Sequence, residues 1–401
     1  MRKNSGLVTR RRFLTAAGVG AITGFAGCAG GDDGGNTGTQ GGTGTGNGNG
    51  NGNGNADVPP LTEFRGSGTI VEGRPAPGGT SISDLPDLSG SFNLYIGGGE
   101  GGIYSTFIDE LEEIYPDFEV FSSFASSSSL AQTIVTEVDA GAPQADLFWS
   151  IDASSLAFVA ENGAYESLSS DTISDVPESF RGADGAWTGV AGRARSVPYN
   201  TDQLSEDDIP DKVADFPDTS ALQGTMGWAP TYGAFKSFVT AMRLERGADA
   251  TRTWLESMDN NGTEEFGNEF LVSSRVADGE LDAGFANHYY AMRVKNQRPD
   301  APIDLAFTQG DAGALVDVAG ALKIQGTSKG DLVENFVRHL LSAEAQEYFA
   351  TVSFAYPMIP EVQPVGGLPT IDELSPPDID LAELANLEPT LELMQDAGVL
   401  G

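Results

Sequence analysis

The chain has almost no side chains that bind soft metals, and it carries little positive charge. Its 401 residues include one cysteine and two histidines, and 22 lysines and arginines stand against 58 aspartates and glutamates. A single cysteine cannot form an internal disulfide, and the shortage of thiol and imidazole ligands argues against structural zinc. The formal net charge of −36 argues against nucleic acid as a partner, because nucleic acid is itself a polyanion.

The acidic residues are dispersed along the chain, and only six lysines are present. This pattern is typical of a solvated, solubilising surface and predicts an acidic, halophilic protein. This composition indicates a high-salt habitat and does not indicate which ligand the protein binds.

The first 27 residues predict an export signal. Thr9–Leu14 contains paired arginines and precedes the apolar run Phe13–Ala26, which is too short to span a bilayer as a mature helix. The paired arginines resemble a twin-arginine signal, which implies export of a folded protein. Phe25–Cys28 resembles a lipoprotein cleavage box, which implies a lipid on Cys28; the alternative is an incidental small residue. Without residues 1–27 the chain keeps 17 basic and 58 acidic residues, a net charge of −41.

A linker follows the signal. Residues 29–57 are almost entirely Gly, Asn, Thr, Asp and Gln, a composition that buries too little apolar surface to become ordered. We therefore expect the lipidated Cys28 and a flexible Gly/Asn-rich linker over residues 28–90, which would hold a globular domain above a membrane.

Residues 91–401 are too many for one core, so we expect two lobes. Apolar runs with strand character alternate with helical patterns. The expected order is strand, helix, strand, helix, over Phe92–Ile96, Ile103–Ile114, Phe118–Phe124 and Leu130–Asp139. Such an order predicts a parallel sheet covered by helices, and no fixed repeat indicates a solenoid.

The segment Gly284–Tyr290 ends in two adjacent tyrosines, Tyr289 and Tyr290. A phenol is neutral at working pH, but a bound metal selects the deprotonated oxygen, which suits a hard trivalent cation. The pair therefore points to ferric iron. The alternative is an ordinary strand pair with one ring buried and one exposed, so both rings reach one ion only if the strand ends or bends here.

Several segments resemble, in order and spacing, the iron(III)-binding periplasmic-type substrate-binding proteins of ABC transporters. The resemblance covers roughly residues 91–365. Its segments are Leu94–Glu100, Ala145–Asp152, Gly192–Arg195, Val197–Asn200, Trp228–Phe235, Asn287–Tyr290 and Asp311–Gly320. It implies an α/β two-lobed periplasmic-binding-protein fold (type II), with mixed, mostly parallel sheets, a hinge and an interlobe cleft. The implied divisions are 91–195 and 313–401 for the first lobe with the C-terminal helices, and 196–312 for the second.

The resemblance assigns Tyr289 and Tyr290 as paired ferric ligands and makes Tyr232 the third candidate. Gly233 and Ala234 follow it at the start of a helix, whose amides favour a synergistic anion. The family's asparagines, which bind the anion or orient the tyrosines, correspond to Asn268 and Asn287. By default, an asparagine beside a strand is a turn residue.

The first-lobe ligands are less well defined, because Gly99 and Ile151 stand where some family members have histidine and glutamate. Glu100 and Asp152 are the adjacent carboxylates; the alternative for each is a helix-start acid. Arg193 and Arg195 are two residues apart, so on a strand both would face the cleft and fix an anion or balance phenolates. The alternative for them is an ion pair between lobes.

These features predict a lipid-anchored, monomeric, extracytoplasmic receptor that passes ferric iron to an ABC transporter permease and catalyses no reaction. The main alternative keeps the fold but binds an oxyanion, an organophosphate or a thiamine-like molecule. An exported hydrolase is disfavoured because Ser273–Arg275 forms no nucleophile elbow and no H-E-x-x-H motif occurs. Gly97–Gly102 matches G-x-G-x-x-G, but no acidic residue follows Phe118–Phe124 to hold a ribose. An inert surface protein would not need the clustered tyrosines.

Overall fold

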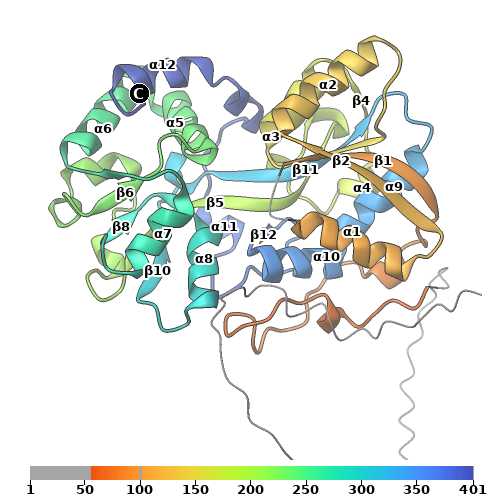
Figure 1. Ribbon diagram of the computed structural model, residues 1–401, viewed down its shortest axis with the longest axis horizontal. Coiled ribbons are helices and arrows are strands. Elements are labelled where there is room, and N and C mark those ends of the chain that lie inside the picture. Colours follow the sequence, from red (N-terminus) through yellow and green to blue (C-terminus); the bar gives the residue numbers. More distant parts are fainter. Residues whose placement is uncertain (1–55, 99–101, 401) are drawn as a thin grey trace, which may run out of the picture. The chain divides into compact units, whose positions relative to one another are not determined.

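The computed structural model describes residues 56–98 and 102–400 (Figure 1). The expected signal peptide, the expected lipid site Cys28 and the candidate ligand Glu100 lie outside these residues. Over the same two ranges, every helix is too short or too polar to traverse a lipid bilayer.

The first lobe contains the elements expected from the sequence. The strands β1 (Gly90–Gly97), β2 (Phe118–Ala125) and β3 (Leu147–Ser150) are parallel, in the order β2-β1-β3. The connecting helices are α1 (Ile103–Ile114) and α2 (Ser127–Asp139). The predicted strand–helix–strand–helix order is therefore confirmed. The sheet becomes mixed where β11 (Val316–Ile324) joins β3 antiparallel.

One long strand, β5 (Thr188–Asn200), belongs to both lobes. Its first half pairs antiparallel with β11, and its last residues, from Val197, pair antiparallel with β10 (Ile303–Ala306). Near its end it also pairs with β8 (Ala283–Gly284), which is followed by β6 (Met226–Trp228) and β7 (Glu264–Glu265) in the second-lobe sheet. A single strand thus carries side chains to both sides of the lobe junction.

Two short elements on β5 bring in later parts of the chain. The strand β9 (Ala286–Asn287) pairs with β5 at Arg195, and β12 (Tyr356–Pro357) pairs with it at Gly192. The tyrosine pair therefore follows directly on a strand that is hydrogen-bonded to the crossover.

Helices cover both sheets. The remaining helices are α3 (Ala153–Glu161), α4 (Ser170–Ile173), α5 (Gly233–Arg246), α6 (Ala248–Asn260), α7 (Glu269–Ala277), α8 (His288–Gln297), α9 (Gly330–Leu340), α10 (Ala343–Tyr348), α11 (Ile371–Leu374) and α12 (Glu388–Asp396). A two-residue strand, β4 (Tyr165–Glu166), lies beside β11.

Each lobe has an aromatic core. In the first lobe Tyr104 stacks on Trp149 with ring centroids 4.2 Å apart. In the second, Phe238 stacks on Phe285 at 5.6 Å, and Trp254 packs edge-on against both. Fully burying one such side chain stabilises the fold by about 1.5–3 kcal/mol, so the second cluster holds α5 and α6 firmly on the second-lobe sheet.

The expectation of a flexible linker up to residue 90 is wrong for its second half. Phe64 is 3% exposed and contacts Phe107 of α1, with ring centroids 6.4 Å apart. Arg65 and Arg74 both contact the fully buried carboxylate of Glu347 in α10, at 2.6 and 3.0 Å. The segment is ordered because it supplies apolar side chains and the two cations that a buried carboxylate needs.

The C-terminal segment returns to the second lobe. Thr390 of α12 shares a hydrogen bond with Thr240 of α5 at 2.9 Å, and α12 also contacts α6. The preceding short helix Leu381–Ala385 contacts α3 of the first lobe. The predicted lobe divisions at residues 195 and 312 stay a prediction.

Candidate metal centre

The tyrosine pair lies at the start of a helix. β9 ends at Asn287, and α8 begins at His288, so Tyr289 and Tyr290 occupy its first turn, with ring centroids 4.4 Å apart. Both are buried, at 4% and 9% exposure. The condition set by the sequence, that the strand ends before the tyrosines, is met, and the alternative of an ordinary strand pair is excluded.

Tyr232 joins the pair from a different element. It is the N-cap residue of α5, and its phenol oxygen forms a close hydrogen bond with that of Tyr290. Their ring centroids are 6.2 Å apart. The structure therefore brings together all three tyrosines named from the sequence.

The protonation of Tyr290 follows from its surroundings. Burial raises its pKa most, and the neighbouring Tyr289 and the hydrogen bond with Tyr232 raise it further. Without a metal, this phenol keeps its proton, because burial removes much of the solvation that would stabilise the anion. A ligand that binds the phenolate must therefore displace the proton.

Arg293 was not singled out by the sequence analysis. Its guanidinium carbon lies 5.0 Å from the ring centroid of Tyr289 and 5.6 Å from that of Tyr290. A cation within about 6 Å of an aromatic face is attracted to it. The signal was present in the spacing, since residues three and four positions apart lie on the same helix face.

His288 holds the start of α8 in place. It is completely buried; its Nε2 donates to the carbonyl oxygen of Phe354 at 2.6 Å, and its Nδ1 accepts from the backbone N–H of Ala194 at 3.2 Å. Burial lowers its pKa to about 4, so the ring is neutral. This residue was not predicted, and it ties the tyrosine helix to the crossover strand.

Asn287 and Arg195 belong to one buried group on the second lobe. Arg195 Nη1 donates to Glu269 Oε1 at 2.5 Å and to Asn287 Oδ1 at 3.1 Å. The amide nitrogen of Asn287 donates to the phenol oxygen of Tyr289 at 3.4 Å. Arg195 Nη2 is buried and has no hydrogen-bond partner within the described part of the chain. Glu269 had no role in the sequence analysis.

The other anion-site candidates have mixed placements. Gly233 is exposed, and a Cβ atom there would meet no atom within 4 Å, so space is open beside the first turn of α5, to which Ala234 also belongs. Asn268 instead acts as the N-cap of α7, because its Oδ1 accepts from the backbone N–H of Leu271 at 3.0 Å.

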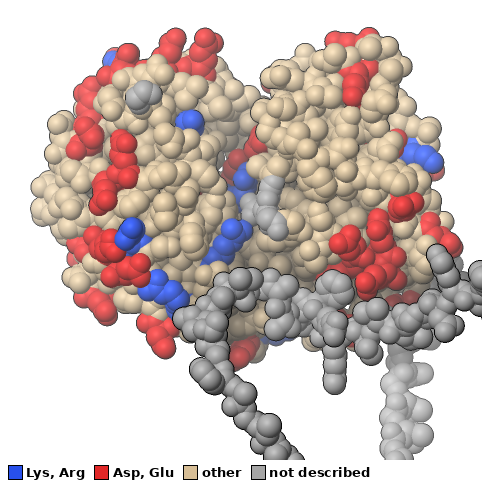
Figure 2. All heavy atoms as spheres, in the orientation of Figure 1, with Lys and Arg blue, Asp and Glu red and all other residues tan. Residues whose placement is uncertain are grey.

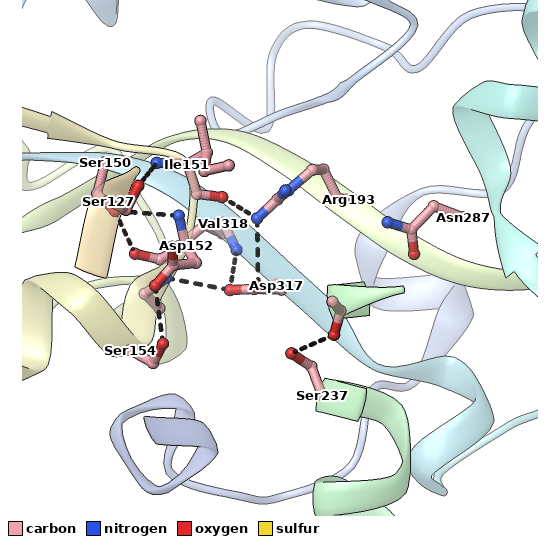
Figure 3. Close-up of polar contacts among 12 residues, drawn as sticks. Ser127, Ser150, Ile151, Asp152, Ser154, Arg193, Ser237, Asn287, Asp317 and Val318 are labelled. Atoms are coloured by element: carbon pink, nitrogen blue, oxygen red, sulfur yellow. Dashed lines mark hydrogen bonds and ion pairs between the residues drawn. The ribbon is translucent and has the colours of Figure 1, made fainter. Parts of the chain in front are cut away.

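On the first lobe, Asp152 caps α3, since its Oδ1 accepts from Ser154 Oγ and from the backbone N–H of Ser155, both at 2.7 Å. Arg193 forms an ion pair with Asp317 at 3.2 Å and donates to the carbonyl oxygen of Ile151. In Figure 3, Arg193 points from β5 toward these first-lobe groups, with Asn287 on its other side. Asp152, in turn, has the contacts expected from its alternative role, an acid at the start of a helix.

The two arginines therefore contact different lobes. Arg193 pairs with Asp317 of β11, and Arg195 pairs with Glu269 of α7. By the predicted divisions, the pair of Arg195 with Glu269 joins the two lobes, as the alternative proposed, and the pair of Arg193 with Asp317 lies within the first lobe. Burial raises the pKa of Asp317, and the charge of Arg193 opposes that rise. No group of three or more histidine, cysteine, aspartate or glutamate side chains in residues 56–98 and 102–400 is placed to hold a metal. The oxygen ligands that do lie close together are the phenols of Tyr232, Tyr289 and Tyr290.

The fold and this site define a two-lobed solute receptor. The sequence matches the family of bacterial extracellular solute-binding proteins over residues 106–374, and the chain belongs to that family. The family resemblance inferred from the sequence is therefore confirmed.

Similar proteins of known name are described as iron-binding. The chain is 30% identical over 267 residues to the major ferric iron-binding protein of Neisseria meningitidis serogroup B, which covers 64% of this chain and 78% of that one. It is 27% identical over 277 residues to the Fe(3+)-binding periplasmic protein of Serratia marcescens, which covers 68% and 80%.

Solved structures confirm the predicted α/β two-lobed fold. Iron-bound HitA from Pseudomonas aeruginosa superposes with a TM-score of 0.65 at 27% identity, over 77% of this chain and 99% of that one. Apo FutA2 from Synechocystis gives a TM-score of 0.64 at 24% identity, over 78% and 99%, and supports the fold alone.

Proposed function

We propose that this protein is a receptor that binds ferric iron and delivers it to an ABC transporter permease. The observation that carries this proposal is the convergence of the half-buried Tyr232 with the buried Tyr289 and Tyr290, from two separate elements, into one cluster. Three phenolates balance the charge of one trivalent ion. Relatives named for ferric iron binding support the same ligand.

Proton exchange accounts for both capture and release. Because burial raises the pKa of Tyr290, the metal-free site holds a phenol, and iron must displace its proton. Opening of the lobes would admit water and allow the oxygens to be reprotonated. No bond in the ligand is made or broken, so we expect no catalytic activity.

A synergistic anion is part of the proposal. A Cβ atom at Gly233 would meet no atom within 4 Å, so there is room beside the first turn of α5, where the helix dipole favours negative charge. Arg195 keeps a buried donor nitrogen with no partner among the described residues. We retain Ala234, Asn268, Asn287 and Arg193 as further anion contacts. An anion bound here would share the iron with the phenolates.

The first lobe would complete the iron's coordination by closing. Asp152 uses only Oδ1 for the cap of α3, and we retain it with Glu100 as the carboxylate candidates. Membership of an extracellular family and the N-terminal sequence support export by the twin-arginine route and anchoring through Cys28. We also propose that the receptor is a monomer.

A ferric titration tests the proposal. We expect a visible tyrosinate-to-iron charge-transfer band on adding ferric citrate to the purified protein, and loss of this band in Tyr289→Phe/Tyr290→Phe. Tyr232→Phe should shift the band and weaken binding. Tyr199→Phe, a buried tyrosine of β5 elsewhere in the second lobe, is the matched control. Equal binding of an oxyanion by the parent and the double variant, with no ferric band, would favour the anion receptor instead.

A further inference from the structure

Glu269 is a buried carboxylate that the proposed function leaves without a role. It lies in the first turn of α7 and has no solvent exposure. Its Oε1 accepts from Arg195 Nη1 at 2.5 Å, and its Oε2 accepts from the backbone N–H of Asn287 at 2.8 Å. One carboxylate thus fixes both the arginine and the residue that precedes the tyrosine helix. A buried charge is costly unless it is paired in this way.

The contact with Arg195 fixes the orientation of the Asn287 side-chain amide. A guanidinium group has only donors, so the atom of Asn287 that faces Arg195 Nη1 at 3.1 Å is the acceptor Oδ1. The donor Nδ2 then points the other way and contacts the phenol oxygen of Tyr289 at 3.4 Å. If the amide were reversed, it would place a second donor against Arg195 and an acceptor against Tyr289.

We infer that Glu269 is a positioning residue for the metal ligand Tyr289, acting through Arg195 and Asn287. A donor aimed at a phenolate oxygen stabilises that oxygen when it is bound to a metal and holds the ring in place. Partners of this kind change metal affinity by about 10- to 100-fold. The inference rests on the proposed function, because it concerns the same tyrosine.

The orientation gives the three tyrosines different surroundings. Tyr289 receives a donor from an amide that is itself held by an ion pair. Tyr290 is hydrogen-bonded to Tyr232, whose position depends on α5, and also to Tyr289. Removing the contacts that run from Glu269 through Arg195 and Asn287 should therefore alter the bond from Tyr289 to the metal. The contact between Tyr232 and Tyr290 should stay in place.

The test removes both charges together, because a single change would leave one buried charge unpaired. In Arg195→Met/Glu269→Gln, the side chain at 269 can still accept from the Asn287 N–H, but the amide of Asn287 loses the donor that orients it. We expect a 10- to 100-fold loss in ferric affinity, measured against citrate. We also expect the charge-transfer band to move to longer wavelength, because a phenolate without a donor gives up its electron more easily.

Three further variants make the result specific. Asn287→Ala removes the donor itself and should give the same band shift, and combining it with the double variant should add nothing. Lys323→Met/Glu334→Gln removes a first-lobe ion pair of 2.7 Å and should leave the band unchanged. Glu269→Asp keeps the charge but shortens the side chain, so it provides a second route if the double variant does not fold; it should show the same shift.

The outcomes separate the two claims. If the parent protein shows no charge-transfer band, the proposed function fails, and this inference fails with it. If the parent shows the band, but the double variant and Glu269→Asp keep its position and the parental affinity, only the role of Glu269 is overturned. Band shifts that add in the combined variant would also overturn it, because Glu269 would then not act through Asn287.

Discussion

At the scale of single residues, the buried cluster shows how one side chain type takes different roles. Tyr289 and Tyr290 are neighbours in sequence, yet one contacts the amide of Asn287 and the other contacts Tyr232. Arg293 lies over both rings. The two phenols also interact with each other, because a side-chain hydrogen bond with Tyr289 contributes to the raised pKa of Tyr290.

Glu110 of α1 provides a residue-scale prediction away from the site. Burial raises its pKa to about 7, and Glu113 and Asp109 add to the rise. The folded protein therefore holds this proton up to about pH 7, whereas the unfolded chain releases it near 4.5. The stability it contributes is complete below pH 4.5 and is lost as the pH rises through 7.

Glu110→Gln should therefore raise the free energy of unfolding at pH 8 by about 1–2 kcal/mol, with the difference shrinking toward zero near pH 4.5. Urea unfolding at pH 8 and at pH 5 measures it. Glu161→Gln, an exposed carboxylate at the end of α3, is the control and should change little. A gain of the same size at both pH values would contradict the assignment.

At the scale of elements, the ordered segment before β1 links parts of the chain that are distant in sequence. Besides its contacts with α10, it places Val71 in the same apolar cluster as Tyr289 and Met292 of α8. Gly68 lies beside Asn296 at the other end of that helix. The segment thus packs against the helix that carries the tyrosine pair.

Replacing both anchors of this segment should be costly. Arg65→Met/Arg74→Met leaves the fully buried Glu347 without its two cations, and we expect a loss of about 3–5 kcal/mol in unfolding free energy. Adding Glu347→Gln should restore part of the loss, since the remaining group is then neutral. Chemical unfolding of the three proteins measures both steps, and an unchanged stability in the first variant would show that the segment does not stabilise the fold.

At the scale of the whole molecule, local patterns predicted more than long-range contacts. The first helix and the alternation of strands and helices follow from apolar periodicity, and α1 has the predicted bounds. The three tyrosines were found because their residue type and order are distinctive. Glu269, His288 and the packing of Arg65 on Glu347 were missed, because each depends on a partner 18 to 282 residues away. Asn268 caps α7 in the structure, and its predicted role toward the anion or the tyrosines stays a prediction.

Charge is a second property of the whole molecule. Acidic side chains are scattered across the face shown in Figure 2 and outnumber the basic ones. Repulsion among exposed charges weakens the compact state, and salt screens it over about 10 Å at 0.1 M. We expect the midpoint of thermal unfolding to rise steadily between 0.1 and about 2 M KCl. A midpoint that peaks near physiological salt would sink the halophilic interpretation.

The central claim is that three tyrosines hold one ferric ion, and anomalous diffraction at the iron absorption edge tests it most directly. Crystals grown with ferric iron should show one strong peak within bonding distance of the phenol oxygens of Tyr232, Tyr289 and Tyr290. A peak held by carboxylates elsewhere, or no peak beside the tyrosines in a protein saturated with iron, would contradict the account.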